Sequence, residues 1–527
     1  MLKARKVLSL VLMLAMVVTA MLTGCGQKAA ETADTAKEKS QAATEEKKSE
    51  EKKSDDKKSE LKPVTLSWYV IGKPQKDTEL VEQEVEKYLK DKINAKVKIN
   101  YLDWGAYEQK LNVMIATGEK FDLCFTAGWQ LNFQQNASKG AWYDIKDLVD
   151  KYGPHLKEKY GKYLSACMTN GKLYGIPYNL SGLGAQGAAY IRKDLADKYK
   201  LDVKSLTKYE DLEPFFDQIM KNEKGITPLC MAGGNGTVGL FNIYWDQPDQ
   251  SVPSLGVKAD DQTCTVINTD MSPEGIHDRE LLRKWNQKGY IRKDAVSIKD
   301  NNIEMKSKKY AAQIGGYVPG WKENYEINWG FETYVAPLST KPLINTQTVI
   351  QSCVAVSKTS ENPDRAVMLL DLVNSDPVLL NLLGFGIEGK HYVTVDKSDP
   401  VIHIIKQPDG VTTETNGYKT NMEWMFGDPW MLYSDVPNRK DLVEQQKKAV
   451  ENGIISPING FVFNEAPVKT QVAQLTAIFQ EYKSVWNTGN MDLAKFPTYQ
   501  ERLNKAGLED VLKEMQKQIN EWKANKK

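Results

Sequence analysis

The stretch VTLSWYVI at residues 64–71 is followed by TELVEQEVEKYL at 78–89 and by KVKINY at 96–101. The first stretch is apolar and rich in β-branched residues, the second repeats apolar residues at helical spacing, and the third alternates apolar and polar residues. This order predicts a strand, a helix and a second strand. Such alternation is typical of an α/β fold in which a parallel sheet has helices on both faces.

A third strand is predicted from FDLCFT at residues 121–126, after a helix that ends at Gly118. This strand runs directly into the loop that contains Trp129. Ligands of parallel sheets bind beyond the carboxyl ends of the strands, which is where this loop should lie. Trp129 is therefore a candidate ligand contact.

A second series of strands and helices predicts a second α/β lobe. Strands are expected at 188–192, 226–231, 311–318 and 331–338, and helices at 194–199, 209–221 and from Ser272 onward. From Asp441 the chain is expected to be mostly helical. The helices expected at 471–485 and 499–522 have charges between their apolar residues, so they should pack on the lobes.

The N-terminus has the order of charges and apolar residues of a bacterial export signal. Three cations precede Val7, an apolar run too short for a permanent membrane helix reaches Met21, and LTGC follows at 22–25. These last residues resemble the lipobox of bacterial lipoproteins, whose cysteine is acylated. We therefore expect residues 1–24 to be a lipoprotein signal peptide. Cys25 is expected to carry the lipid, palmitate, that anchors the chain to the extracytoplasmic face of the cell membrane.

Residues 25–62 are expected to be the lipidated cysteine and a disordered tether. From Gly26 to Lys62 the chain consists almost wholly of Lys, Glu, Asp, Ala, Ser, Thr and Gln, without an aromatic residue. Such a segment cannot bury enough apolar surface to offset the entropy of ordering. Contact with the membrane should therefore be through the lipid anchor only.

Charge and cysteine content narrow the functional classes. The chain contains 70 Lys and Arg against 69 Asp and Glu, and three of the cations lie in the expected signal peptide, so a nucleic-acid partner is not expected. The cysteines after Cys25 are odd in number, widely spaced and without a CxxC pair, which argues against a disulfide framework. Cys124 and Cys353 lie in apolar strand-like runs, where a thiol usually acts as a small buried hydrophobe.

Four passages carry a family resemblance, namely GKLYGIP at 171–177, YIRKDL at 190–195, AAQIGGY at 311–317 and SKTSENPDRA at 357–366. In order and spacing the chain resembles an extracellular solute-binding lipoprotein of an ABC transporter, of the family 1 sugar-binding type. From GIEGKHY at 386–392 to the closing helices it further resembles a subgroup with a distinctive helical C-terminal extension.

The resemblance implies a two-lobed, periplasmic-binding-protein-like (type II) fold with strands that cross between the lobes and a cleft that closes by a hinge motion. Residues 63–186 would begin lobe 1, 187–338 would form lobe 2, 339–386 would return to lobe 1, and 387–527 would complete lobe 2 and form the helical extension. It also implies a monomeric receptor that delivers a carbohydrate, here expected to be an oligosaccharide, to ABC permease subunits.

A sugar site needs flat aromatic rings for the apolar ring faces and side chains that hydrogen-bond to the hydroxyl edges. Trp129 and Trp321 are the first candidates, because both lie in loops and the resemblance puts a cleft-lining aromatic residue at Trp321. Tyr178 and Asn179 follow the Gly-Ile-Pro element at an expected crossing between the lobes, which would direct them into the cleft.

Further candidates have a structural alternative. Trp245, Trp424, Asp428 and Trp430 lie in aromatic, irregular stretches where a role in the core is an equal alternative, and Glu388 could bind hydroxyls or cap a turn. By contrast, Trp68, Trp285 and Trp522 fall on strand or helix faces and are expected in the core.

Two other functions stay open: a binder of peptides or other small solutes on the same fold, and a surface-anchored glycoside hydrolase, which needs two suitably placed carboxylates. No catalytic residue or metal ligand is expected, because the four histidines lack metal-ligand spacing and neither HExxH nor GxSxG occurs. GLGAQG at 182–187 matches a dinucleotide fingerprint but leads into a strand rather than a helix, so no cofactor is expected.

Overall fold

Five strands form the first sheet of the computed structural model, which describes residues 61–233, 245–248, 254–338 and 341–525. Their order is β2 (Ala95–Leu102), β1 (Val64–Ile71), β3 (Leu123–Thr126), β15 (Cys353–Val356) and β6 (Ile176–Pro177). β1 runs parallel to β2 and β3, which confirms the predicted parallel strands. β15 runs antiparallel to β3 and β6, so a segment far along the chain completes the sheet. The expected signal peptide, Cys25 and nearly all of the tether lie outside the described residues.

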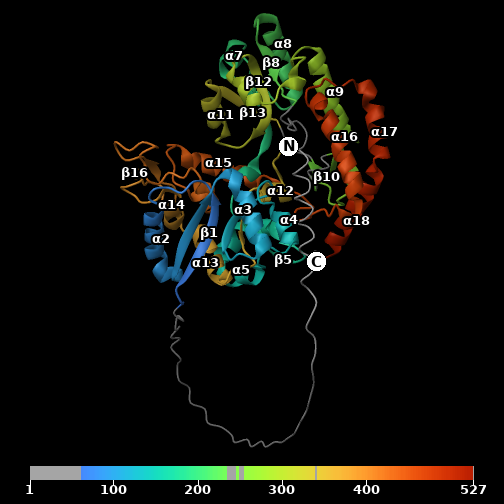
Figure 1. The fold of residues 1–527 in the computed structure, drawn as a ribbon. Coiled ribbons are helices and arrows are strands. Elements are labelled where there is room, and N and C mark those ends of the chain that lie inside the picture. The colour runs from blue at the N-terminus through green and yellow to red at the C-terminus, as the bar shows by residue number, and fades with distance from the viewer. Residues whose placement is uncertain (1–60, 234–244, 249–253, 339–340, 526–527) are drawn as a thin grey trace, which may run out of the picture. The chain divides into compact units, whose positions relative to one another are not determined.

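Two helices join the first strands, α2 (Thr78–Ile93) and α3 (Trp104–Thr117) (Figure 1). α2 buries Val81, Val85 and Leu89, the residues whose spacing predicted it. These side chains belong to the same hydrophobic cluster as the strands of the first sheet, so burial of one helix face holds α2 on the sheet.

The second sheet has its own core. Its strands lie in the order β13 (Thr333–Pro337), β7 (Gln186–Arg192), β12 (Tyr310–Tyr317) and β8 (Thr227–Cys230). Against it pack α8 (Glu213–Asn222) and α9 (Pro273–Gln287), whose Phe216 and Trp285 rings meet edge to face at 5.6 Å. A second α/β lobe was predicted from the sequence, and the fold class is confirmed.

The C-terminal region is helical, as expected, with α16 (Lys469–Asn487), α17 (Phe496–Lys505) and α18 (Leu508–Asn525). These helices share a hydrophobic cluster with a three-stranded sheet of β11 (Val266–Asn268), β10 (Leu255–Lys258) and β9 (Trp245–Asp246). Tyr499 of α17 is fully buried in this cluster, and its hydroxyl donates to Asp270 at 2.7 Å.

One stretch packs differently from the expectation that 387–527 completes the second lobe. Buried residues between Ile402 and Val450, including Tyr418 and Phe426, belong to the core of the first sheet. Phe426 meets Trp68 of β1 edge to face at 5.4 Å, and the Tyr418 hydroxyl lies 3.0 Å from that of Tyr101 in β2. Long-range aromatic contacts therefore hold this stretch on the first sheet. The other expected boundaries stay predictions.

Among the described residues, no single helix has the length and apolar character needed to cross a membrane. One bent pair, α13 (Pro363–Val373) and α14 (Pro377–Phe385), meets the length and composition test when its helices are taken together, with 94° between them. Both helices contribute buried residues to the core of the first sheet, among them Leu369 and Leu380.

Candidate functional site

Three of the twelve tryptophans expose more than a third of their surface: Trp104 at 48%, Trp129 at 53% and Trp321 at 39%. Trp104 follows the end of β2, and Trp129 follows the end of β3. Because β2 and β3 flank β1 in parallel, their carboxyl ends meet at one edge of the sheet. The two rings stack there, with centroids 5.9 Å apart and an angle of 28° between their planes.

Phe125 and Trp424 complete this cluster, which we call the tryptophan platform (Trp104, Phe125, Trp129 and Trp424). The fully buried Phe125 ring meets Trp129 at 5.8 Å and Trp424, edge to face, at 5.6 Å. Trp424 comes from the short 3₁₀ helix η8 (Glu423–Met425). The exposed Trp129 ring therefore rests on a buried ring that belongs to the core, and the Trp104 ring stacks on Trp129.

Hydrogen bonds hold the Trp129 ring of the platform and the backbone at Trp104. The Trp129 indole N–H donates to the carbonyl oxygen of Gln351 at 2.8 Å. Trp104 is the first residue of α3, where Asp103 accepts hydrogen bonds from the N–H groups of Gly105 and Ala106. A ring held as Trp129 is loses little conformational entropy when a ligand stacks on it.

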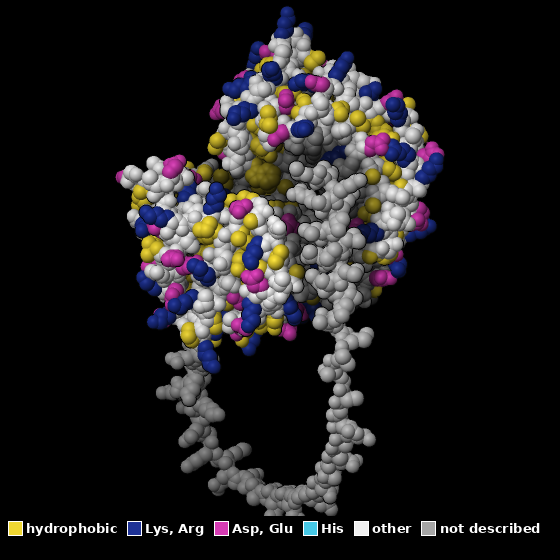
Figure 2. Space-filling model, in the orientation of Figure 1, with side chains coloured by type: hydrophobic (Ala, Val, Ile, Leu, Met, Phe, Trp, Pro, Cys, Tyr) yellow, Lys and Arg dark blue, Asp and Glu magenta, His cyan; other side chains and the backbone are white. Residues whose placement is uncertain are grey.

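Trp321 lies on the second sheet, at the start of α11 (Trp321–Trp329) and against Gly316 of β12. In Figure 2, a hollow with hydrophobic side chains at its floor lies between α3 and α11. Trp321 and the tryptophan platform thus supply exposed rings from both sheets.

Trp430 belongs to a chain of hydrogen bonds that runs through α15 (Arg439–Glu451) to the segment after β12. It is 8% exposed, and its indole N–H donates to Gln446 of α15 at 2.9 Å. The Gln446 amide donates in turn to the carbonyl oxygen of Pro319, two residues before Trp321, at 2.7 Å. Gln446 therefore links Trp430 to the turn that precedes Trp321, and the Trp430 ring is buried in this structure.

Four further candidates lie outside the tryptophan platform, and none of them presents an exposed aromatic ring. Tyr178 is 1% exposed and lies in the core of the first sheet, and Trp245 is 6% exposed in β9. Asp428 is 2% exposed and binds the Lys159 ammonium at 2.7 Å. Asn179 accepts hydrogen bonds from Ser181, and its carbonyl oxygen accepts one from the Gln351 amide at 3.4 Å. Asn179 is thus linked to the segment that orients Trp129.

Glu388 lies apart from the platform. Its half-exposed carboxylate forms an ion pair with Lys397 at 3.2 Å and lines an open surface cavity of about 590 Å³ beside Tyr392 and His403. The sequence could not distinguish a ligand contact from a turn residue here, and the structure shows an ion pair at the surface.

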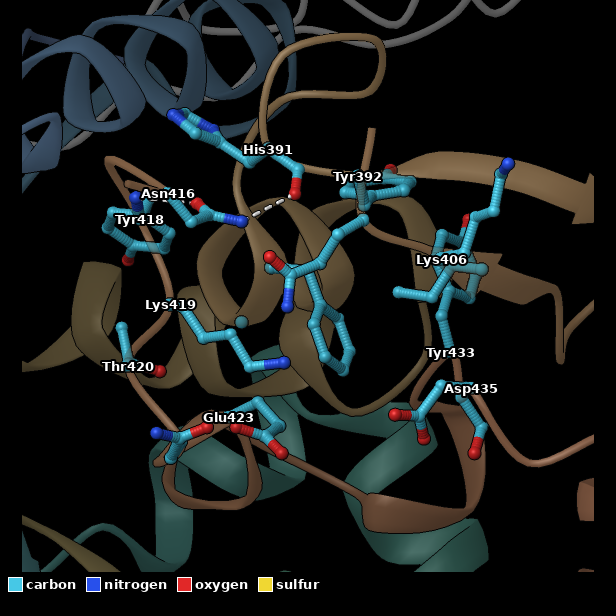
Figure 3. Close-up of a pocket in the computed structure, with 16 residues that line it drawn as sticks. His391, Tyr392, Lys406, Asn416, Tyr418, Lys419, Thr420, Glu423, Tyr433 and Asp435 are labelled. Carbon is cyan, nitrogen blue, oxygen red and sulfur yellow. Dashed lines mark hydrogen bonds between the residues drawn. The ribbon is translucent and has the colours of Figure 1, made fainter. Parts of the chain in front are cut away.

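A second cavity, of about 500 Å³, adjoins the platform through η8. Glu423 lines this cavity, whereas the next residue, Trp424, belongs to the platform. Figure 3 shows the Lys419 ammonium extending into the cavity above the Glu423 carboxylate, with the Asp435 carboxylate across from both. Rings, amides and charged groups thus surround one space.

The charges of this cavity are weakly compensated. In the part of the chain that the structure describes, no ion pair holds Lys419, Glu423 or Asp435. Burial raises the pKa of Glu423 above its usual range, and Lys419 opposes this only in part. The cavity therefore offers both a cationic donor and carboxylate acceptors to a polar ligand.

Sequence reasoning missed Trp104, Phe125, Lys419 and Glu423. Trp104 could have been found, because it follows a predicted parallel strand just as Trp129 does. Lys419 and Glu423 lie in an irregular segment without periodicity, and only the long-range packing of that segment on the first sheet positions them.

Comparisons with known proteins agree with this geometry. Residues 83–387 match the family model described as "Bacterial extracellular solute-binding protein", and residues 457–524 match a domain of unknown function, DUF3502. A carbohydrate ABC transporter substrate-binding protein of Streptococcus pneumoniae serotype 4 is 29% identical over 476 residues, which cover 88% of this chain and 92% of that protein.

A second relative and a solved structure extend the comparison. The fructooligosaccharide ABC transporter substrate-binding protein FusA of Streptococcus pneumoniae is 23% identical over 81% of this chain and 85% of its own. The crystal structure of the N-glycan transport solute binding protein NgtS of Streptococcus pneumoniae has a TM-score of 0.74, with 27% identity over 88% of this chain and 100% of that chain.

The ion pair of Asp428 gives a stability prediction. Asp428→Asn should lower the free energy of unfolding by about 2 kcal/mol or more, since it leaves the partly buried Lys159 ammonium without a counter-charge. In the control variant Asp409→Asn, the lost pair with Lys406 is exposed, so the change should stay within about 0.5 kcal/mol. Urea unfolding measures both, and equal effects would contradict the structural role of Asp428.

Glu423 gives a prediction about pH. Because its pKa is raised in the folded state, the folded chain holds a proton that the unfolded chain, with a pKa of about 4.3, has released. The stability that this proton confers is therefore lost as the pH rises above about 4. Glu423→Gln has no carboxyl group at this position and does not lose this stability. The melting temperature of the variant should therefore rise relative to that of the wild type as the pH increases above about 4.

A matched control has the opposite sign. Arg502 holds the pKa of the Glu481 carboxyl below its usual value, so the stability from this pair is present at neutral pH and lost on acidification. Glu481→Gln should therefore lose melting temperature relative to the wild type as the pH rises. Melting curves recorded from pH 3 to pH 8 compare the variants, and parallel curves would contradict the assignment.

Proposed function

The protein belongs to the bacterial extracellular solute-binding protein family, whose model matches more than half of the chain, and we propose that it is a receptor that delivers an oligosaccharide to an ABC importer. Relatives named for carbohydrate, fructooligosaccharide and N-glycan transport support the ligand class. The tryptophan platform is the observation that carries the proposal, because exposed rings fixed in place suit the apolar faces of sugar rings.

The cavity beside η8 extends the proposed site beyond one sugar ring. Its volume of about 500 Å³ lies within the range of about 300–1,000 Å³ that is usual for ligand pockets. One sugar unit would stack on the platform, while a second would reach Lys419, Glu423 and Asp435, whose charged groups hydrogen-bond well to hydroxyls. This arrangement favours an oligosaccharide over a monosaccharide.

Ring contacts from both sheets support a closing motion. A sugar that touches Trp129 on one sheet and Trp321 on the other binds the closed arrangement better than the open one, so it shifts the population toward the closed form. The hydrogen bonds of Gln446 to Trp430 and Pro319 would guide Trp321 during this motion. The closed form would then dock on the permease, without a catalytic step.

The N-terminal residues supply the proposed location. Export by the signal peptide at residues 1–24 and acylation of Cys25 would hold the receptor on the extracytoplasmic face of the membrane, beside its permease. A tether from Gly26 to Lys62 would leave the binding body free to reach that permease, and anchoring would raise the effective concentration of the two partners.

A ligand screen tests the proposal. The purified protein is titrated calorimetrically with mannose- and N-acetylglucosamine-containing N-glycans, fructooligosaccharides, their monosaccharides and a set of peptides, and each sample is analysed for products. Saturable binding of one oligosaccharide class without turnover is expected, together with a raised melting temperature. Cleavage of a glycan would favour the hydrolase, and binding of peptides alone would overturn the assignment to sugars.

Tryptophan variants test the platform. Trp104→Ala and Trp129→Ala should each weaken binding of the glycan found in the screen by about tenfold or more, which corresponds to the loss of one stacked ring. Trp321→Ala should act in the same direction. Ile327→Ala is its control, because Ile327 lies on the same helix and is 80% exposed. Unchanged affinity in both Trp104→Ala and Trp129→Ala would remove the platform from the site.

A further inference from the structure

Two buried cysteines face each other in the core of the first sheet. The Sγ atoms of Cys167 and Cys353 are 3.8 Å apart, although 186 residues separate the two positions in the chain. Cys167 ends the 3₁₀ helix η1 (Gly161–Cys167), and Cys353 begins β15. Both side chains are fully buried.

The backbone on both sides of this pair is held in place. Cys353 lies opposite Thr126 of β3 and Pro177 of β6, and the carbonyl oxygen of Cys167 accepts a hydrogen bond from the N–H of Tyr174 at 3.1 Å. A disulfide needs an S–S distance of about 2.05 Å. The two sulfur atoms are already in van der Waals contact, so formation of the bond requires them to approach by about 1.8 Å.

The other cysteines differ from this pair. Within the described ranges, Cys124, Cys230 and Cys264 are equally buried, but no sulfur atom of another cysteine lies within 4 Å of theirs. Burial alone therefore does not bring thiols together in this fold, and the contact between Cys167 and Cys353 is specific to the place where η1 meets β15.

We propose that Cys167 and Cys353 form a disulfide when the chain folds under oxidising conditions, which the proposed export would provide. The oxidant is the disulfide of an extracytoplasmic thiol–disulfide oxidoreductase or a small-molecule disulfide. One cysteine thiolate attacks this disulfide, which forms a mixed disulfide and releases one thiolate of the oxidant. The second cysteine thiolate then attacks the mixed disulfide and releases the other. The pair loses two electrons and two protons, and the oxidant gains them as two thiols.

The bond would close before the core does. Burial raises the pKa of the Cys353 thiol well above its usual value, so the native core disfavours the thiolate that attacks an oxidant. Exchange therefore takes place while this region is still open, and the finished fold protects the bond from reductants.

The position of the pair gives the bond a structural role. The chain leaves the first sheet at β6, builds the second sheet, and returns at β15. A link between η1 and β15 therefore ties the helix that precedes β6 to the strand at which the chain returns. It stiffens the base from which the second sheet would move, and it restricts the unfolded chain over a long loop.

Peptide mass spectrometry on the full chain tests the proposal. The chain is unfolded and reduced, refolded in a buffer of oxidised and reduced glutathione, alkylated in acid-quenched denaturant, and digested without reduction. A linked peptide that contains Cys167 and Cys353, and that separates on reduction, is expected. Recovery of both residues as alkylated or glutathione-capped cysteines would overturn the proposal.

Protein prepared from membranes of the producing cells, alkylated in the same way, shows whether the bond forms in the cell. If the disulfide between Cys167 and Cys353 forms on refolding but is absent from the membrane preparation, the two cysteines can pair as proposed. The absence in the cell would then count against the proposed export. Wild-type protein that is unfolded and refolded in the presence of reductant should melt several degrees lower than wild-type protein refolded oxidatively. Cys167→Ser and Cys353→Ser should not respond, whereas Cys124→Ser, which removes a buried thiol without a sulfur neighbour, should respond like the wild type.

Discussion

The rest of the structure depends on the pairing of β15 with β3 and β6. This pairing joins residues more than 170 positions apart, so its loop closure costs entropy that local contacts do not recover. Complete burial of the Val354 and Val356 side chains in the core of the first sheet offsets that cost. Once β15 is in place, the carbonyl oxygen of Gln351, just before it, can hold the indole of Trp129. The tryptophan platform is thus a consequence of a long-range strand pair.

The same pairing explains the glycines that follow β6. A Cβ atom at Gly182 would lie 2.5 Å from the Gln351 amide, and one at Gly184 would lie 2.8 Å from the Cβ of Ala449 in α15. At Gly184 the crossing segment therefore passes too close to α15 for a side chain, whereas at Gly182 the end of the Gln351 side chain would have to move. GLGAQG at 182–187 matches a dinucleotide fingerprint for this reason, and the short 3₁₀ helix and strand that it forms offer no helix N-terminus to a phosphate.

Local patterns predicted the elements, and long-range contacts decided the site. The parallel strands of the first sheet, α2 and the C-terminal helices follow from periodicity, because the buried faces of these elements repeat every two or about 3.6 residues. The position of Trp129 followed from the rule about strand ends, which applies equally to Trp104. Tyr178, Asp428 and Trp430 lie in irregular segments. Their side chains face the core because of partners elsewhere in the chain, such as Lys159 and Gln446, that no local pattern identifies.

One short helix joins the two parts of the proposed site. In η8, Glu423 faces the cavity and Trp424 meets Phe125 of the platform. Because the two residues are neighbours in one short helix, a ligand that displaces Glu423 would also displace Trp424. The irregular segment around η8 lacks a sheet of its own and is held by the Tyr418 and Phe426 contacts with β2 and β1. Its position is therefore as fixed as the first sheet itself. A glycan that spans platform and cavity would meet a preorganised surface on this sheet and spend its binding energy on moving Trp321 toward it.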